Sequence, residues 1–197
     1  QSVFNVYGFT DNEPIGLINA LTSLSFVDCI VNLNSDTLLM PNNSLLSISD
    51  RYIKNSVIYS PGGTITLNMD NNAYIQDCDI SDVTLTGIIQ INGSNVVFNE
   101  NAVLNGTLEN YSSTSYLDIY GDFTNNGIVK NKGNGFNFNM DLFGNIINNA
   151  LWTNRNTYLE GTETHAITQG PGSEFAGYEF NAVAGTGLIT FMTDINF

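Results

Sequence analysis

The chain has 197 residues and a formal net charge of −14, with five Lys and Arg residues against 19 Asp and Glu residues. So few cations exclude a surface that neutralises nucleic-acid phosphates, and the same charge disfavours binding to anionic membranes. Charged residues make up only 12% of the chain whereas Asn is abundant, which indicates a globular protein with an uncharged polar surface rather than an acidic disordered tail.

Residues 1–24 form a segment of their own, for which we expect an N-terminal strand and a capping helix. The chain opens at Gln1 without the basic and apolar pattern of a signal peptide, as expected of a chain that follows a processed signal or belongs to a longer one. No apolar run reaches the roughly 18 residues of a membrane span. Residues 11–24 start with Asp11 and Pro14 and then place apolar residues at three-residue steps, which predicts a short amphipathic helix that caps the first coil of the next domain. The alternative is an irregular loop.

From residue 25 onward the sequence repeats. Six stretches, such as Phe26–Val31 and Val103–Leu108, share the order apolar, any, Asn or Asp, small, any, apolar. The small residues recur at intervals of roughly 20 to 30 residues, which is the period of a solenoid whose repeats stack. They are Cys29, Ser56, Cys78, Gly106, Gly127 and Ala150.

Two polar positions accompany each small residue. The residue before it is Asp28, Asn55, Asp77, Asn105, Asn126 or Asn149. The residue four positions after it is Leu33, Ser60, Asp82, Asn110, Asn131 or Asn154, so only Leu33 breaks the pattern. In a stacked coil these positions predict structural ladders, in which the small residue fits an inward bend and the Asn side chains bond along the stack.

Between these marks the chain alternates apolar and polar residues. Thr64–Leu67, Ile88–Ile91 and Tyr116–Tyr120 are examples, and they predict short strands separated by Asn, Gly, Ser and Pro. No stretch of residues 25–197 carries a 3.6-residue apolar stripe, so parallel strands must be connected without helices. The sequence therefore predicts an all-β, right-handed parallel β-helix of about eight coils over residues 25–197.

The Asn105-Gly-Thr-Leu and Asn125-Asn-Gly-Ile turns, followed by residues 144–149, carry a family resemblance. They resemble the right-handed β-helix repeats of secreted and cell-surface proteins of Bacteroidetes-type bacteria, many of them large adhesin-like chains. The resemblance covers about residues 24 to 160 and implies an extracellular or bacterial cell-surface location. It does not fix an activity, because the same repeat occurs in adhesins and lyases.

The C-terminal coils are expected to be uncapped. Residues 158–197 lose the repeat, contain the break Gly170-Pro-Gly-Ser173 and end in an apolar stretch over residues 187–197. A solenoid end without a polar cap offers a free strand edge for pairing. We expect either a continuing chain, which we favour, or self-association with another copy.

The cysteines and the histidine suggest structural roles. Cys29 and Cys78 share one pattern position with the Ser56 coil between them, which predicts a separation of about 9.5 Å and excludes a disulfide, whose Cα atoms lie within about 7 Å. Two unpaired, buried thiols are expected. No Cys or His partner favours a metal. His165 has no nucleophile at a suitable spacing, so a structural or surface role is expected.

Acidic and aromatic residues supply the candidate chemistry. Asp77, Asp79 and Asp82 form the densest acidic cluster and are a candidate Ca²⁺ site, the alternative being solvated corner residues. A lyase would also need Arg51 or Lys54 as its base. Outward-facing tyrosines would stack on sugar rings, and carboxylate pairs would support glycoside hydrolysis. The tyrosines are Tyr116 and Tyr120, and the carboxylates are Glu100, Glu109, Asp118, Asp122 and Asp141.

Together these features predict a non-catalytic extracellular or cell-surface structural or adhesion module. It would need no cofactor other than Ca²⁺, would bind a polysaccharide or surface ligand, and would self-associate through the open solenoid end. The alternatives are a polysaccharide-active β-helix enzyme, either a lyase or a glycoside hydrolase, and a filament subunit that polymerises.

Overall fold

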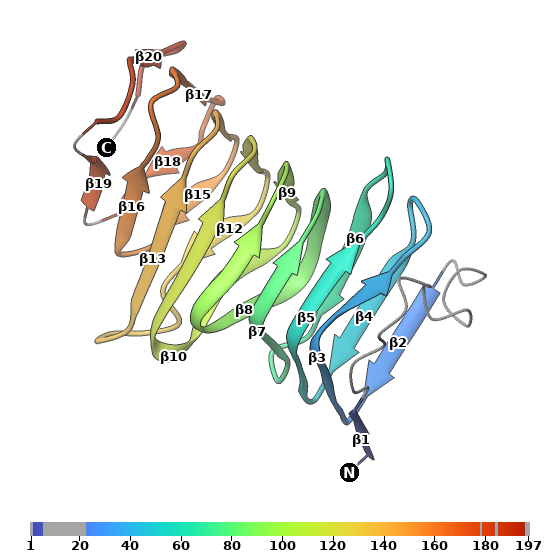
Figure 1. Cartoon of the computed structure of the whole chain (residues 1–197). Coiled ribbons are helices and arrows are strands. Elements are labelled where there is room, and N and C mark those ends of the chain that lie inside the picture. Colours follow the sequence, from blue (N-terminus) through green and yellow to red (C-terminus); the bar gives the residue numbers. More distant parts are fainter. Residues whose placement is uncertain (1, 6–22, 178, 184, 196–197) are drawn as a thin grey trace.

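The computed structural model of the protein describes residues 2–5, 23–177, 179–183 and 185–195. In this part of the chain there are 20 strands and no helix. Every strand pairing is parallel, and the strands stack into a β-solenoid of about 8 turns with β2 near one end and β20 at the other (Figure 1). The predicted parallel β-helix is confirmed. The predicted capping helix falls on residues 11–24, of which 11–22 lie outside the described residues and Ser23 and Leu24 begin β2.

Each coil crosses two hydrogen-bonded sheets, called A and B. Sheet B takes one short strand from each coil: β2 (Ser23–Val27), β4 (Leu45–Ser49), β6 (Ile65–Met69), the first part of β8 (Val83–Phe98), β9 (Ala102–Leu104), β11 (Phe123–Asn125), β14 (Ile146–Asn148), β17 (His165–Gln169) and β20 (Ile189–Phe191).

Sheet A takes the longer part of each coil, which is either one strand bent in its middle or two short strands. These are β1 (Ser2–Asn5), β3 (Cys29–Leu39), β5 (Tyr52–Tyr59), β7 (Tyr74–Ile80), the rest of β8, β10 (Thr107–Ile119), β12 (Ile128–Lys130), β13 (Asn137–Leu142), β15 (Leu151–Thr153), β16 (Asn156–Leu159), β18 (Glu174–Phe175) and β19 (Glu179–Ala182).

Each coil therefore turns three times. We call the turn from sheet B to sheet A the B–A corner, the turn within sheet A the A bend, and the return to sheet B the A–B corner. In one central coil they lie at residues 126–127, 131–136 and 143–145.

The core consists of side chains stacked in register from coil to coil. One inward column in sheet B runs Leu46, Leu67, Leu85 and Leu104, and all four are buried. The same column then continues with three buried amides, Asn125, Asn148 and Gln169. A second inward column, in sheet A, runs Val31, Ile53, Ile75 and Ile91 and continues with Asn110. The core of the first half of the solenoid is thus aliphatic, whereas the core of the second half also contains amides at the B–A corner and at the A bend.

The buried amides bond the backbone where the chain turns. Asn125 Oδ1 accepts a hydrogen bond from Gly127 N at 3.0 Å, and its Nδ2 donates to Asn148 Oδ1 at 2.7 Å. Asn148 repeats the arrangement one coil later by accepting from Ala150 N at 3.4 Å and donating to Glu174 O at 3.1 Å. Strand pairing does not reach these backbone groups, so a buried amide at the corner satisfies them.

The six-residue repeat covers two different turns, which corrects the single ladder predicted from the sequence. Ser56 and Cys78 are in register at the A bend. Cys29, by contrast, opens β3 directly after the turn at Asp28, so it lies at the B–A corner. Gly106, Gly127 and Ala150 lie at the same corner and are in register with one another, and Cys29 lies two residues farther along the coil.

Both turns favour the same local sequence. Asp28, Asn55 and Asp77 have positive φ values of 52°, 48° and 49°, a conformation that Asn and Asp tolerate better than other non-glycine residues. In the later coils Gly106 and Gly127 lie against each other, and a Cβ on Gly127 would lie 1.9 Å from Gly106 O. The pattern therefore predicts that the chain turns inward at these residues. It does not predict whether the turn is the B–A corner or the A bend.

The two thiols are unpaired, although for a different reason than expected. Cys29 and Cys78 are both free, and they lie on different columns of the coil rather than two coils apart on one column. Cys78 is buried as predicted, whereas Cys29 is only half-buried, which corrects the expectation of two buried thiols. Burial raises the pKa of Cys78 to about 12. A thiol with so high a pKa is neutral and unreactive at physiological pH, so Cys78 serves as a small core side chain.

Candidate functional site

The predicted calcium residues do not form one site. Asp77 and Asp79 line a shallow hollow at the A bend together with Asn55 and Asn95. The Asp77 carboxylate accepts hydrogen bonds from Asn95 Nδ2 and Gln76 Nε2, each at 3.0 Å.

Asp82 lies at the A–B corner instead. Its Oδ1 accepts a hydrogen bond from Asn101 N in the next coil at 2.9 Å. No group of three or more Asp, Glu, His or Cys side chains within the described residues is placed to hold a metal ion. The cluster that looked dense in the sequence is divided because the chain turns between Asp79 and Asp82.

Asp82 starts a ladder that the sequence pattern did not reveal. Asn101 Oδ1 accepts from Asp122 N at 2.9 Å, Asp122 Oδ1 accepts from Asn145 N at 2.8 Å, and Asn145 Oδ1 accepts from Ala166 N at 2.8 Å. Each side chain thus bonds the backbone of the following coil. The recurrence of Asn or Asp at a spacing of one coil was the available signal.

The basic residues predicted for a lyase have other partners. Arg51 Nε lies 2.9 Å from Asp28 Oδ1, an ion pair between successive coils at the B–A corner. This contact, chiefly its hydrogen bond, lowers the pKa of Asp28. Lys54 Nζ lies 5.8 Å from the centre of the Tyr52 ring. Neither basic group lines the hollow at Asp77.

Two of the predicted acids are register partners. Asp118 on β10 pairs with Asp141 on β13, so their side chains occupy one column of sheet A in successive coils. Burial, with the nearby Asp118 and Glu160 carboxylates, raises the pKa of Asp141 to about 6. Burial and Glu160 also raise the pKa of Asp118. Of the other predicted acids, Glu109 pairs with Lys130 at 3.2 Å.

Aromatic side chains form ladders on the outside of the solenoid. Tyr120 stacks on Phe143 of the next coil with ring centres 4.4 Å apart. Tyr52 and Tyr74 stack in the same way at 4.5 Å, and Tyr74 lies 4.4 Å from Tyr111. Because the rings stack on one another, they stabilise the coil stack. Tyr116, one of the two tyrosines predicted to face outward, is 42% exposed.

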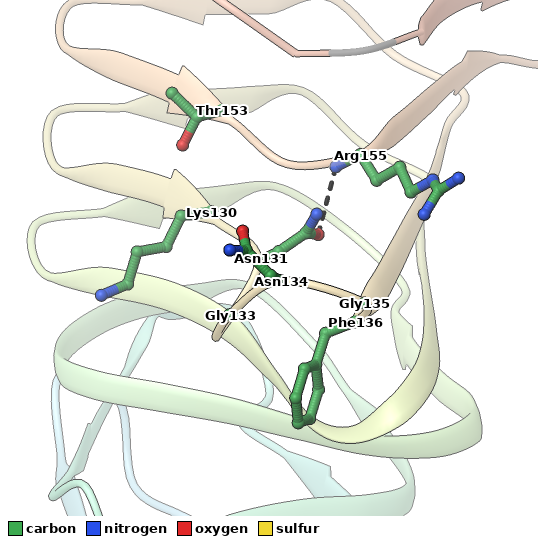
Figure 2. Close-up of a pocket in the computed structure, with 8 residues that line it drawn as sticks. All are labelled: Lys130, Asn131, Gly133, Asn134, Gly135, Phe136, Thr153 and Arg155. Carbon is green, nitrogen blue, oxygen red and sulfur yellow. Dashed lines mark hydrogen bonds between the residues drawn. The ribbon is translucent and has the colours of Figure 1, made fainter.

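A pocket lies at the A bend between β12 and β13. Eight residues separate Lys130 from Asn139 in this coil, whereas two separate their register partners, Thr153 and Asn156, in the next coil. The extra residues bulge outward as a loop, and the shorter path of the next coil leaves a cavity of about 360 Å³ above it. The lining residues are Lys130, Asn131, Gly133, Asn134, Gly135, Phe136, Thr153 and Arg155 (Figure 2).

The predicted ladder residues anchor this loop. Asn131 Oδ1 accepts hydrogen bonds from Phe138 N and from Arg155 N, both at 3.1 Å. Asn110 Oδ1 accepts from Lys132 N at 2.9 Å, and Asn154 Nδ2 donates to Phe138 O at 3.2 Å. The loop is thereby bonded at its base to the coils on either side.

The pocket concentrates the scarce positive charge of the chain. Lys130, Lys132 and Arg155 are three of the five cations, and they lie in the loop or beside it. Lys130 extends to one side of the loop and Arg155 to the other, with the amide side chains of Asn131 and Asn134 between them (Figure 2). Lys132 lies over the Tyr111 ring at 4.6 Å. The sequence showed these cations, but only the fold places Lys130 and Arg155 in the wall of one cavity.

His165 has a structural position. It is fully buried, and its Nδ1 lies 2.8 Å from Gly144 O. Its Nε2 is buried without a hydrogen-bond partner. Of the two roles predicted for His165, structural or surface, the structure supports the structural one.

No protein-family model matches the chain, and comparisons with curated proteins and with solved structures found no similar protein. The described residues include no helix that could span a membrane.

Proposed function

We propose that the protein is a non-catalytic structural and adhesion module of an extracellular or bacterial cell surface. The observation that carries this proposal is the unbroken parallel stack, in which amide and carboxylate ladders join each coil to the next at its corners. Such a stack is a rigid rod whose sides are free for ligand binding. The resemblance of its turns to adhesin-like repeats of Bacteroidetes-type bacteria supports the location and the adhesive role.

Particles coated with the purified chain test this proposal. They should be retained on a surface that carries polysaccharide and should leave that polysaccharide intact, as measured by reducing ends and by absorbance of unsaturated uronates. Particles coated with heat-unfolded chain are the control. Retention equal to that control, or release of cleaved sugar, would contradict the proposal.

A polysaccharide hydrolase is the second candidate, because Asp118 and Asp141 are stacked carboxylates with raised pKa values. Glycosidases use such a pair, with one acid protonated and the other ionised. Asp118→Asn and Asp141→Asn would then each abolish sugar release. An adhesive module would bind polysaccharide equally well with either change.

The C-terminal coil supports self-association. Leu188, Phe191 and Met192 are 70%, 53% and 61% exposed, and β20 pairs with β17 on one side. A second copy that pairs with this edge would cover the apolar side chains. This part of the proposal predicts concentration-dependent assembly, which sedimentation measures.

A further inference from the structure

We infer that the outward face of sheet B binds ice. This face carries a row of β-branched side chains that advances by one residue per coil, and the strands beneath it contain no charged residue. The inference goes beyond the proposed adhesive function and does not depend on it.

The row runs along the outer side of sheet B. Each member precedes by one residue a member of the buried column that contains Leu67 and Asn125, so its side chain points away from the core. The strand register pairs these residues from coil to coil over six successive coils. They are Thr66, Thr84, Val103, Thr124, Ile147 and Thr168.

The row is regular and stiff. The pairings that join its members contain no register shift, whereas three pairings of sheet A do. At about 4.8 Å per coil, the row therefore extends roughly 24 Å along the stack. β-Branched side chains have a restricted χ1, so holding this row against a partner costs little conformational entropy.

Strand propensity alone does not explain the row. β-Branched residues favour strands in general, and yet the outward column of sheet A after the A bend changes from apolar to acidic to aromatic along the stack. That column runs Val57, Asp79, Val97, Asp118, Asp141 and Tyr158. Sheet B instead keeps one side-chain shape over six coils.

The face is uncharged in a strongly acidic chain. The described strands of sheet B contain no Asp, Glu, Lys or Arg, although the net charge of the chain is −14. The Asp82 and Asp122 carboxylates lie beside the face at the A–B corner, where each bonds a backbone N–H of the next coil. A charged partner therefore finds no complementary group on the row itself.

The hydroxyl groups of the row are available to a ligand. No hydrogen bond among the described residues uses the side-chain hydroxyls of Thr66, Thr84, Thr124 or Thr168. A second row of amides borders the first and is fixed along the stack. Asn126 Nδ2 donates to Asn105 Oδ1 at 3.0 Å, and Asn149 Nδ2 donates to Asn126 Oδ1 at 2.8 Å.

Ice matches this combination of groups. Its oxygen atoms recur in straight rows at a spacing slightly shorter than the coil repeat, so the threonine hydroxyls can take the place of lattice water. The methyl groups between them order the adjacent water instead of competing with it for hydrogen bonds. A crystalline polysaccharide fits less well because the row offers no aromatic ring, and Phe123 of the same sheet faces the core.

Incorporation of the whole chain into slowly growing ice tests the inference, with serum albumin in the same solution as the excluded solute. Thr124→Tyr and Thr84→Lys change the row in two different coils. Val97→Tyr is the matched control, because Val97 is a half-buried outward residue of sheet A. Circular dichroism verifies that each variant is folded, and sedimentation measures its oligomeric state.

The fraction of the chain in the ice should exceed that of albumin severalfold. A tyrosine on the row would hold the ice away from the neighbouring coils, so Thr124→Tyr should lower this fraction at least about fivefold. A lysine would bring its own hydration shell, and Thr84→Lys should have a similar effect. Val97→Tyr should leave the fraction unchanged within about 1.5-fold, since it lies on the other sheet.

Three results would overturn the inference. The first is exclusion of the unmodified chain from ice to the same extent as albumin. The second is an equal loss in Thr124→Tyr and Val97→Tyr. The third is a dimer of the unmodified chain that Thr124→Tyr converts to monomer, because a second copy would then cover the face. None of these results bears on retention by polysaccharide, which tests the adhesive function separately.

Discussion

Replacing Asn125 by Leu tests how the corners of the solenoid are held. Asn125 is fully buried in the column that follows Leu104, so a Leu side chain fits the position by shape. The substitution removes three hydrogen bonds: the Gly127 N donation to Oδ1 at 3.0 Å, and the Nδ2 donations to Asn148 Oδ1 at 2.7 Å and Leu151 O at 3.2 Å.

The partners left behind determine the magnitude. Each buried polar group that loses its partner costs about 1 to 3 kcal/mol, which gives a loss of roughly 3 to 9 kcal/mol for three groups. Burial of the Leu side chain offsets about 1.5 to 3 kcal/mol of this. We expect a net loss of about 3 kcal/mol in the free energy of unfolding. In a chain of this length that corresponds to a fall in Tm of roughly 6 to 12 °C.

Asn126→Leu is the matched control, because it changes the neighbouring residue, which points outward. Asn126 is exposed, and it bonds only within the outer ladder, donating to Asn105 Oδ1 at 3.0 Å and accepting from Asn149 Nδ2 at 2.8 Å. Asn126→Leu should lower the free energy of unfolding by less than about 1 kcal/mol, as is usual for exposed sites. Urea unfolding followed by circular dichroism measures both variants. Equal stability of the two variants would refute the claim that the inner ladder holds the corner.

Three further predictions address other parts of the molecule. Gly127→Ala should destabilise the chain by about 1 to 3 kcal/mol, because the added Cβ would lie 1.9 Å from Gly106 O. Gly133→Ala is the control and should change stability by less than about 0.5 kcal/mol, because the nearest neighbour of its Cβ is the Phe136 ring at 3.8 Å. Thermal unfolding compares the two variants. Asp141 has a pKa raised from 3.8 to about 6, so the folded state favours its protonated form and loses stability as pH rises through that range. Asp141→Asn should therefore raise the free energy of unfolding at pH 8 by about 1 kcal/mol, allowing for solvent screening, and should have no such effect near pH 3.5; an equal gain at both pH values would contradict this assignment. Phe191→Ser should shift the sedimentation of concentrated protein toward monomer, and an unchanged profile would exclude the exposed C-terminal strand as the contact.

The sequence predicted the architecture because a coiled stack leaves a strong periodic signal. Asn105, Asn126 and Asn149 were identified as ladder residues, and their side chains do bond from coil to coil. The pattern did not identify Asn125 and Asn148, which bond the buried backbone. The alternation of inward and outward side chains restarts after every turn. The sequence therefore does not show which of two adjacent asparagines, such as Asn125 and Asn126, faces the core.

The candidate sites were less predictable because they depend on register. Asp118 and Asp141 are separated by a distance within the range of the repeat, but their stacking depends on the length of the loop between them. Asp77 and Asp82 are close in sequence and yet take positions at different turns. The pocket arises from a difference in loop length between two coils, which becomes visible only when the coils are aligned.

The most direct test of the account is an NMR titration of the isotope-labelled chain with a soluble oligosaccharide of the polysaccharide that retains the coated particles, followed over a day. The account predicts that amide signals on one side of the solenoid shift while the sugar signals remain those of the intact oligosaccharide. Shifts centred on Asp118 and Asp141, accompanied by new signals of cleaved sugar, would contradict it and would identify the protein as a polysaccharide-active enzyme.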